Sequence, residues 1–198
     1  MSELTTEASG SDESAEAPRF RLDNERLAFR FTATLSDRGA LSVERLSAPG
    51  RLGDWLAAND LTLGDTAATG ADLDLGRRLR EAIHRAGTAT AAGDAPDEHD
   101  ARLMNALARD SEAYLELDAT TARWRTRSKH PARAALGIIA LDAISVIGGP
   151  ESTLVKTCEN PSCSGLYVDA SHGQNRRWCS MNFCGNRAKK ARLRRQSG

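Results

Sequence analysis

The sequence predicts a mainly α-helical protein of the α+β class, in which a helical N-terminal body carries small β-hairpins and a short module follows at the C-terminus. Apolar residues recur at spacings of three and four through much of the body, as on one face of a helix. Two other segments alternate between apolar and polar residues, as half-buried strands do. The four cysteines all follow Pro150, which separates the C-terminal module from the body in composition.

The bulk composition is that of a globular protein. Its 198 residues suffice for one ordinary domain and a small appendage, which can bury a core without covalent cross-links. The chain has no run of eighteen or more apolar residues, so we expect no membrane span and no membrane partner. Residues 1–18 are predicted to form a disordered acidic tail, and they lack the cationic start and apolar stretch of a signal peptide. We therefore expect a cytoplasmic protein.

The zero net charge of the chain conceals an asymmetry between its two parts. Residues 151–198 hold 9 Lys and Arg against 3 Asp and Glu, a balance of +6, whereas residues 1–150 hold 18 against 24, a balance of −6. The sequence therefore divides into the tail, a mainly helical domain over residues 19–150, and a basic cysteine-containing module over residues 151–198.

The helical domain is expected to begin with a hairpin. In LAFRFTATL, residues 27–35, apolar side chains recur at period two, which predicts a half-buried strand. DRG, residues 37–39, predicts the turn, and ALSVERL, residues 40–46, predicts the partner strand. A helix start at Ser47 then predicts a short helix to about Asn59.

Three further helices and a second hairpin are expected in the rest of the body. Apolar spacings of three and four predict a long amphipathic helix over residues 71–92. Pro96 is placed to begin another helix, and AYLELDATTARWRTR, residues 113–127, alternates well enough for a hairpin. The segment from Pro131 to Ile147 is so apolar that it should form the most buried helix, and Gly-Gly-Pro ends it.

The cysteine spacing predicts a metal site. The cysteines form two C-x4-C pairs separated by fifteen residues, Cys158 with Cys163 and Cys179 with Cys184. Zn²⁺ favours four thiolates in a tetrahedron, and a site closed in this way has no position left for a substrate. We therefore expect one structural zinc ion. Two disulfides, four buried thiols, an iron–sulfur cluster, or His172 in place of one sulfur are the alternatives.

The residues after the last cysteine predict a basic helix. Its cations cover much of the circumference, so the helix cannot be buried. Cations on a solvated helix are suited to neutralising phosphates. A basic tail without a partner, or a helix that folds back on the acidic body, are the alternatives. The candidate nucleic-acid contacts are Arg176, Arg177, Asn186, Arg187, Lys189, Lys190, Arg192, Arg194 and Arg195.

This module resembles the CGNR zinc finger family, which is named for the tetrapeptide found here at residues 184–187. The resemblance extends over CENPSCSGLYVD, over RRWCSMNFCGNRAKKARLRR, and over both cysteine intervals. It implies a treble-clef-like or knuckle-type zinc finger that ends in the basic helix and binds DNA. Family members join this finger to an N-terminal domain called ABATE, and the pair is regarded as a stress-linked bacterial transcription regulator.

The body also resembles this family, with one departure. RLSAPGRLGDWLAANDL, residues 45–61, is similar to the family's short helix with an internal tryptophan. Near its start the family usually has a strand that ends in an Asn-Thr pair after an acidic residue, where this chain has Arg30, Ala33 and Thr34. If that asparagine serves a ligand or a turn, this protein lacks it.

Each matching position in the finger has a physical interpretation. Gly185 permits close backbone approach directly after a ligand, and Asn186 can bond to the backbone or to sulfur. Arg187 contacts a phosphate or a base edge, or braces the site. Trp178 and Tyr167 are expected to form the small core of the finger rather than stacking platforms.

The sequence thus favours a zinc-dependent DNA-binding transcription regulator whose body dimerises or senses a small-molecule effector. Because one finger offers little interface, we expect a homodimer. The alternative is a zinc module that binds RNA or a protein partner through its basic helix. We do not expect an enzyme, since His84, His99 and His130 are scattered without a nucleophile motif, a glycine-rich phosphate loop or a second metal cluster.

Overall fold

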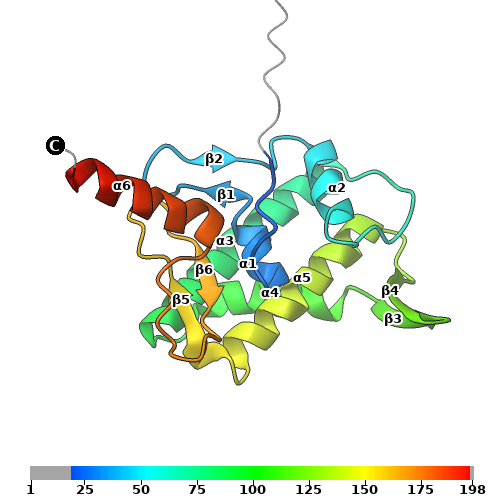
Figure 1. Cartoon of the computed structure of the whole chain (residues 1–198). Coiled ribbons are helices and arrows are strands. Elements are labelled where there is room, and N and C mark those ends of the chain that lie inside the picture. The colour runs from blue at the N-terminus through cyan, green and yellow to red at the C-terminus, as the bar shows by residue number, and fades with distance from the viewer. Residues whose placement is uncertain (1–18, 197–198) are drawn as a thin grey trace, which may run out of the picture.

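The computed structural model describes residues 19–196, so the segment 1–18 predicted as an acidic tail lies outside the described residues (Figure 1). Helices predominate, which confirms the mainly helical α+β class. The helices are α1 (Leu27–Thr32), α2 (Pro49–Ala57), α3 (Gly70–Ala92), α4 (Glu98–Arg109), α5 (Pro131–Gly148) and α6 (Asn186–Gln196). The strands are β1 (Leu35–Ser36), β2 (Val43–Glu44), β3 (Ala113–Asp118), β4 (Thr121–Thr126), β5 (Val155–Thr157) and β6 (Leu166–Val168). Two short helical turns, η1 (Ser152–Leu154) and η2 (Met181–Gly185), flank the C-terminal strands.

Within residues 19–196 the strands form three separate two-stranded antiparallel sheets. β1 pairs with β2, β3 with β4, and β5 with β6. The β3–β4 hairpin is the longest, with Ala113 opposite Thr126 at its base and Asp118 opposite Thr121 at its tip. Because no larger sheet is present in this part of the chain, packed helices supply the core.

α5 forms the centre of the body, as the sequence predicts. Pro131 lies in its first turn, and α1, α3 and α4 all pack against it. Gly137 permits α5 to approach α4 closely, because a Cβ there would lie 2.3 Å from Ser111 Cβ and 2.5 Å from the Leu107 carbonyl oxygen. By length and composition alone α5 could cross a membrane, but 56% of it is buried inside the protein, as is usual for a core helix.

The strand predicted over residues 27–35 is wrong. Residues 27–32 form helix α1, and only Leu35 and Ser36 pair with β2. The buried side chains of α1 are Ala28, Phe29, Phe31 and Thr32, which is helical spacing, and Phe31 packs edge-on against Trp55 with ring centroids 4.9 Å apart. The Ala28 amide donates a hydrogen bond of 2.7 Å to the Asp142 carboxylate of α5, which satisfies the start of this short helix from a distant segment.

The other predicted elements of the body are present. α2 and α3 occupy the predicted ranges, and α3 begins with a capping box in which Thr69 and Asp72 satisfy each other's backbone amides. α4 begins two residues after Pro96, at Glu98, because the Asp97 side chain caps it. The second hairpin is confirmed as β3–β4.

The C-terminal module shares the hydrophobic core of the body. Val155, Leu166 and Val168 of the β5–β6 hairpin are buried in the same cluster as Phe29 of α1 and Leu79 of α3. Gly87 of α3 makes this contact possible, because a Cβ there would lie 2.6 Å from Leu166 Cδ1. The composition changes at Pro150, but the packing is continuous across it.

Candidate metal centre and basic groove

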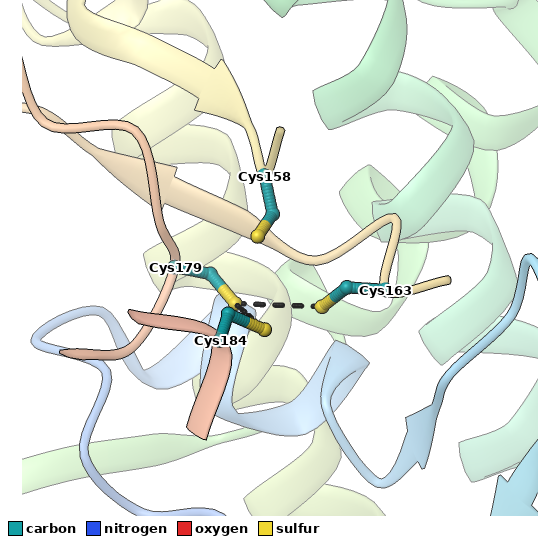
Figure 2. A group of neighbouring side chains, drawn as sticks. All are labelled: Cys158, Cys163, Cys179 and Cys184. Carbon is teal, nitrogen blue, oxygen red and sulfur yellow. Dashed lines mark hydrogen bonds between the residues drawn. The ribbon is translucent and has the colours of Figure 1, made fainter. Parts of the chain in front are cut away.

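The four cysteines converge from two distant parts of the module (Figure 2). Cys158 follows β5, and Cys163 lies in the turn before β6. Cys179 lies in the loop before η2, and Cys184 lies within η2. All four sulfur atoms lie within 4.8 Å of one another.

The donor set fits one structural zinc ion. Zn–S bonds of about 2.3 Å in a tetrahedron place the sulfurs about 3.8 Å apart. The Cys163 and Cys179 sulfurs are 3.5 Å apart, and those of Cys179 and Cys184 are 3.8 Å apart. All four cysteines are free thiols, so the alternative of two disulfides is not what the structure has. Four protein ligands leave no open coordination position, and His172, which is exposed, lies outside the cluster.

Hydrogen bonds among the four cysteines lower the pKa of some thiols and raise the pKa of others. The Cys158 thiol has a strongly lowered pKa because Cys163, Cys179 and Cys184 all donate to its thiolate. The pKa values of Cys163 and Cys179 are raised, first because each donates to Cys158. The pKa of Cys184 is also lowered, and a lowered pKa favours the thiolate, the form that binds a metal.

Backbone hydrogen bonds shape the two cysteine turns. The Cys158 amide donates to the Gly165 carbonyl at 2.8 Å, and the Cys163 amide donates to Asn160 at 2.9 Å. In η2 the Cys184 amide donates to the Ser180 carbonyl at 3.0 Å. Gly165 has no room for a side chain, because its Cβ would lie 3.0 Å and 3.1 Å from the Cys179 and Cys163 sulfurs. Gly165 therefore lies directly against the sulfur cluster.

Arg176 supports the loop that carries Cys179. Its guanidinium donates to the carbonyls of Trp178 at 2.8 Å and Cys179 at 2.7 Å, and it stacks on the Tyr167 ring at 4.8 Å. Tyr167 is buried, and burial raises its pKa to about 12. Trp178 is half-buried and packs against the cysteines. Both rings therefore contribute to the small core of the finger.

Asp169 organises the same loop and was not recognised from the sequence. Its buried carboxylate accepts hydrogen bonds from Lys156 Nζ at 2.6 Å, Ser171 Oγ at 2.5 Å and the Arg176 amide at 3.0 Å. Burial alone would raise the pKa of Asp169, but these donors outweigh it and lower the pKa to about 2. No pattern at fixed spacing in the sequence connects Asp169 with these side-chain and backbone donors, so the sequence could not have revealed its role.

A basic groove lies beside the metal centre, between α6 and the loop before Cys179. It is an open depression of about 620 Å³, and Trp178 and Gly185 form part of its wall. Four cations converge on it from the loop and from one face of α6: Arg177, Lys189, Arg192 and Arg195. Arg177 also pairs with Glu159 at 2.5 Å. We call these residues the basic groove.

The other candidate nucleic-acid contacts have different environments. Lys190 and Arg194 are exposed on α6 outside the basic groove. Asn186 donates to the Asn182 carbonyl at 3.0 Å, within the turn that leads into α6. Arg176 is held by the backbone carbonyls described above, and Arg187 by a carboxylate of the body.

Comparison with known families agrees with this two-part structure. Residues 25–150 match the ABATE family, described as "Putative stress-induced transcription regulator", and residues 155–197 match the CGNR zinc finger. The chain belongs to the ABATE family. The resemblance drawn from the sequence is therefore confirmed for both parts. No curated protein matches the chain closely enough to count as a relative.

The arginine of the CGNR signature joins the finger to the ABATE domain. Arg187 pairs with the carboxylate of Asp37, which also accepts a hydrogen bond of 2.9 Å from Arg21. Asp37 is buried in the connection after β1 and adopts a left-handed backbone conformation, with φ of 56°. Burial raises the pKa of Asp37, but Arg187 and Arg21 outweigh it and lower the pKa below its usual value. We call Asp37, Arg21 and Arg187 the clasp.

Three further hydrogen bonds tie the ABATE domain to the finger. Asn24 Nδ2 donates to the Leu166 carbonyl at 2.8 Å, and the Ser180 hydroxyl donates to Asp23. His84 of α3 donates through Nε2 to the Ser164 carbonyl at 2.8 Å, beside the turn that holds Cys163. Burial lowers the pKa of His84, so it remains the neutral donor near pH 7. His84 is thus a satisfied structural residue.

Replacing a zinc ligand is expected to destabilise the whole chain. On the composition alone, Cys179→Ser would unfold only the finger, but the shared core links the finger to α1 and α3. We therefore expect Cys179→Ser to lose its zinc and to lower the melting temperature of the entire protein. Zinc content by atomic absorption and thermal melting by circular dichroism measure both effects. His172→Ala is the matched control and should keep zinc and stability, while an unchanged body transition in Cys179→Ser would contradict a shared core.

Removing the charge of Asp37 is expected to lower the stability of the protein by an amount that depends on pH. Asp37→Asn retains a residue that tolerates the left-handed backbone but leaves Arg21 buried without its carboxylate, which costs about 1–3 kcal/mol near pH 7. Because the folded pKa of Asp37 lies below its unfolded value, its contribution is complete above about pH 5 and fades below about pH 4. Urea unfolding of both proteins at several pH values tests this. A constant difference in stability would show that the Asp37 charge is not the cause.

Proposed function

We propose that this protein is a zinc-dependent, DNA-binding transcription regulator whose CGNR finger contacts DNA. The observation that carries the proposal is the basic groove. There Arg177 and three cations of α6 (Lys189, Arg192 and Arg195) gather beside the metal centre that anchors this helix. Four cations around a groove of this kind can each neutralise a phosphate. The match to a family described as transcription regulators supports the same function.

In this proposal some residues hold the finger in shape, and others contact DNA. When bound, zinc supplies a cross-link between the two cysteine turns and no reaction. The clasp fixes the first turn of α6 against the ABATE domain, so Arg187 acts as a brace. The rest of α6 stands in solvent with its cations exposed. The ABATE domain is close to neutral, with 18 Lys and Arg against 19 Asp and Glu over residues 19–150, so the positive charge of the finger orients the protein as it approaches DNA.

The ABATE domain is assigned the regulatory role in this proposal, by dimerising or by sensing an effector in a bacterial cytoplasm. We also propose that the protein is not an enzyme. Over residues 19–196, the one cluster of side chains that could hold a metal is the cysteine site, whose four positions are filled by the protein. That arrangement suits a structural ion rather than a reactive one.

Trp178 favours a second candidate function, recognition of RNA. An aromatic ring beside several cations is the arrangement that binds single strands, because bases stack on the ring while the cations hold the phosphates. In this protein Arg177 already lies over the Trp178 ring at 5.2 Å, and that ring is half-buried. Duplex DNA therefore remains our first choice, since it needs the cations and not the ring face.

Selection of bound duplexes from a genomic fragment pool tests the proposed function. The zinc-loaded full chain is incubated at near-physiological salt, and its zinc content is determined on the same sample. We expect one recurring sequence, because a specific regulator prefers its site well beyond the phosphate background. Full zinc loading with no preferred duplex would contradict the proposal, and preferential retention of single-stranded RNA would support the second candidate instead.

Removing two cations of the basic groove is expected to weaken binding in a salt-dependent way. Lys189→Ala with Arg192→Ala should lower affinity about 10- to 100-fold and reduce the salt slope by about 2, since two phosphate contacts are lost. Fluorescence anisotropy with labelled duplex at several salt concentrations measures both. Arg78→Ala with Arg133→Ala, an equal charge change at exposed positions of the body, is the control. Equal weakening by both pairs would mean that net charge, not the groove, governs binding.

A further inference from the structure

A narrow cavity reaches the sulfur cluster from the contact between the ABATE domain and the finger. The ABATE domain contributes the end of α1 and strand β1 to its wall, and the finger contributes Cys163, Cys179 and Ser180. Asp23, which also lines the cavity, is exposed, whereas Cys163 is only 3% exposed. The cavity therefore extends from the surface of the protein to the sulfur of a buried zinc ligand.

The size of this cavity limits what can enter it. Its volume is about 30 Å³. A cavity needs about 10–15 Å³ to hold one water molecule, so this one has room for one or two molecules of that size. The zinc ligands Cys163 and Cys179 are thus open to very small molecules and closed to larger ones.

The wall of the cavity suits a polar molecule. Thr32, Ser36 and Ser180 contribute hydroxyl groups to it. Arg21 lies in the same wall, and its Nε is buried without a hydrogen-bond partner among residues 19–196. A buried donor without a partner costs free energy, which favours a small hydrogen-bond acceptor at this place.

Cys163 and Cys179 are positioned to bond with each other (Figure 2). Their sulfurs are 3.5 Å apart, closer than the 3.8 Å between those of Cys179 and Cys184. A disulfide bond is about 2.05 Å long, so the two sulfurs need to approach by only about 1.5 Å. The two cysteines that line the cavity are therefore also a pair that can form a disulfide.

We propose that Cys163 and Cys179 are a site of oxidation by hydrogen peroxide, which reaches their sulfurs through this cavity. Hydrogen peroxide is polar and only slightly larger than water, so it fits both the wall and the volume. A peptide disulfide or an aromatic hydroperoxide is too large to enter. The cavity thus selects the oxidant by its size.

The reaction balances with hydrogen peroxide as the one oxidant. The thiolate of one cysteine attacks an oxygen of the peroxide, the O–O bond breaks, and a sulfenic acid and a hydroxide ion form. The second thiolate attacks the sulfenic sulfur and displaces its oxygen as another hydroxide ion. The two sulfurs lose two electrons to the peroxide, and two protons from solvent convert the hydroxide ions into water.

The disulfide removes two of the four zinc ligands. Cys158 and Cys184 remain, and two thiolates hold zinc far more weakly than four. Oxidation therefore releases the metal and removes the cross-link at the start of α6. Loss of DNA binding would follow, and this last consequence alone rests on the proposed function.

Zinc release from the zinc-loaded full chain tests the proposal, measured with a chromogenic zinc indicator. Hydrogen peroxide should release zinc, and dithiothreitol with added zinc should restore the site. Cumene hydroperoxide should act at least about tenfold more slowly, because it does not fit the cavity, after each rate is divided by that of the same peroxide with free cysteine. Equal normalised rates, or zinc retained in a large excess of hydrogen peroxide, would overturn the proposal.

Peptide mapping of the wild-type protein identifies the cysteines that react. Mass spectrometry without reduction should find Cys163 linked to Cys179 in the protein that has just released its zinc. A first disulfide within either C-x4-C pair, Cys158 with Cys163 or Cys179 with Cys184, would show that the cavity does not select the site.

A larger side chain in the cavity wall should slow the oxidation. Ala33, the C-terminal cap of α1, lines the cavity, so Ala33→Leu is expected to lower the rate of zinc release at least about fivefold. Ala58→Leu is the matched control, since Ala58 caps α2 in the same way and lies outside the cavity. Circular dichroism and zinc content verify the fold before peroxide is added.

An unchanged rate in zinc-loaded Ala33→Leu protein would contradict entry through the cavity. If this variant fails to hold zinc, the comparison of the two peroxides on wild-type protein decides. None of these readouts involves DNA, so failure here is separate from failure of the proposed function.

Discussion

Four sulfur atoms meeting at one point are the constraint on which the rest of this structure depends. The turn between β5 and β6 and the turn η2 bury few apolar side chains besides their cysteines, and neither could hold its shape by packing alone. Their convergence within 4.8 Å fixes η2, and η2 leads directly into α6. The four cysteine ligands, which come from the β5–β6 turn and from η2 with the loop before it, therefore fix the direction in which α6 leaves the metal centre.

The contact between the finger and the ABATE domain determines which cations are available. Arg187 belongs to the signature that names the finger, yet its guanidinium pairs with a buried carboxylate of the other domain. Arg176 is similarly occupied by backbone carbonyls. The cations left for a partner are those farther along α6 together with Arg177, and four of them surround one groove. A count of positive residues in the sequence therefore overstates the number of cations available to a partner. The structure shows where the available cations converge.

The predictable parts of this protein are those determined by local spacing. Two C-x4-C pairs specified the metal centre, and the apolar periodicity over residues 71–92 and 131–147 specified α3 and α5. α1 could not be predicted in this way, because six residues with alternating apolar side chains fit a strand equally well, and what decides is Asp142 capping the helix from α5. The clasp was beyond sequence reasoning for a similar reason. Asp37 and Arg187 are 150 residues apart, and no rule of spacing connects an aspartate in a turn with that arginine.

The packing of Leu166 against Gly87 has a consequence for the order of events during synthesis. The segment that carries Leu166 follows the whole ABATE domain, so α1 and α3 leave the ribosome before their last apolar neighbour has been translated. Until then Phe29 and the surface around Gly87 face water. The nascent protein therefore exposes an apolar surface that chaperones and other chains can bind. The core of the ABATE domain is therefore complete only when the final fifth of the chain has been made.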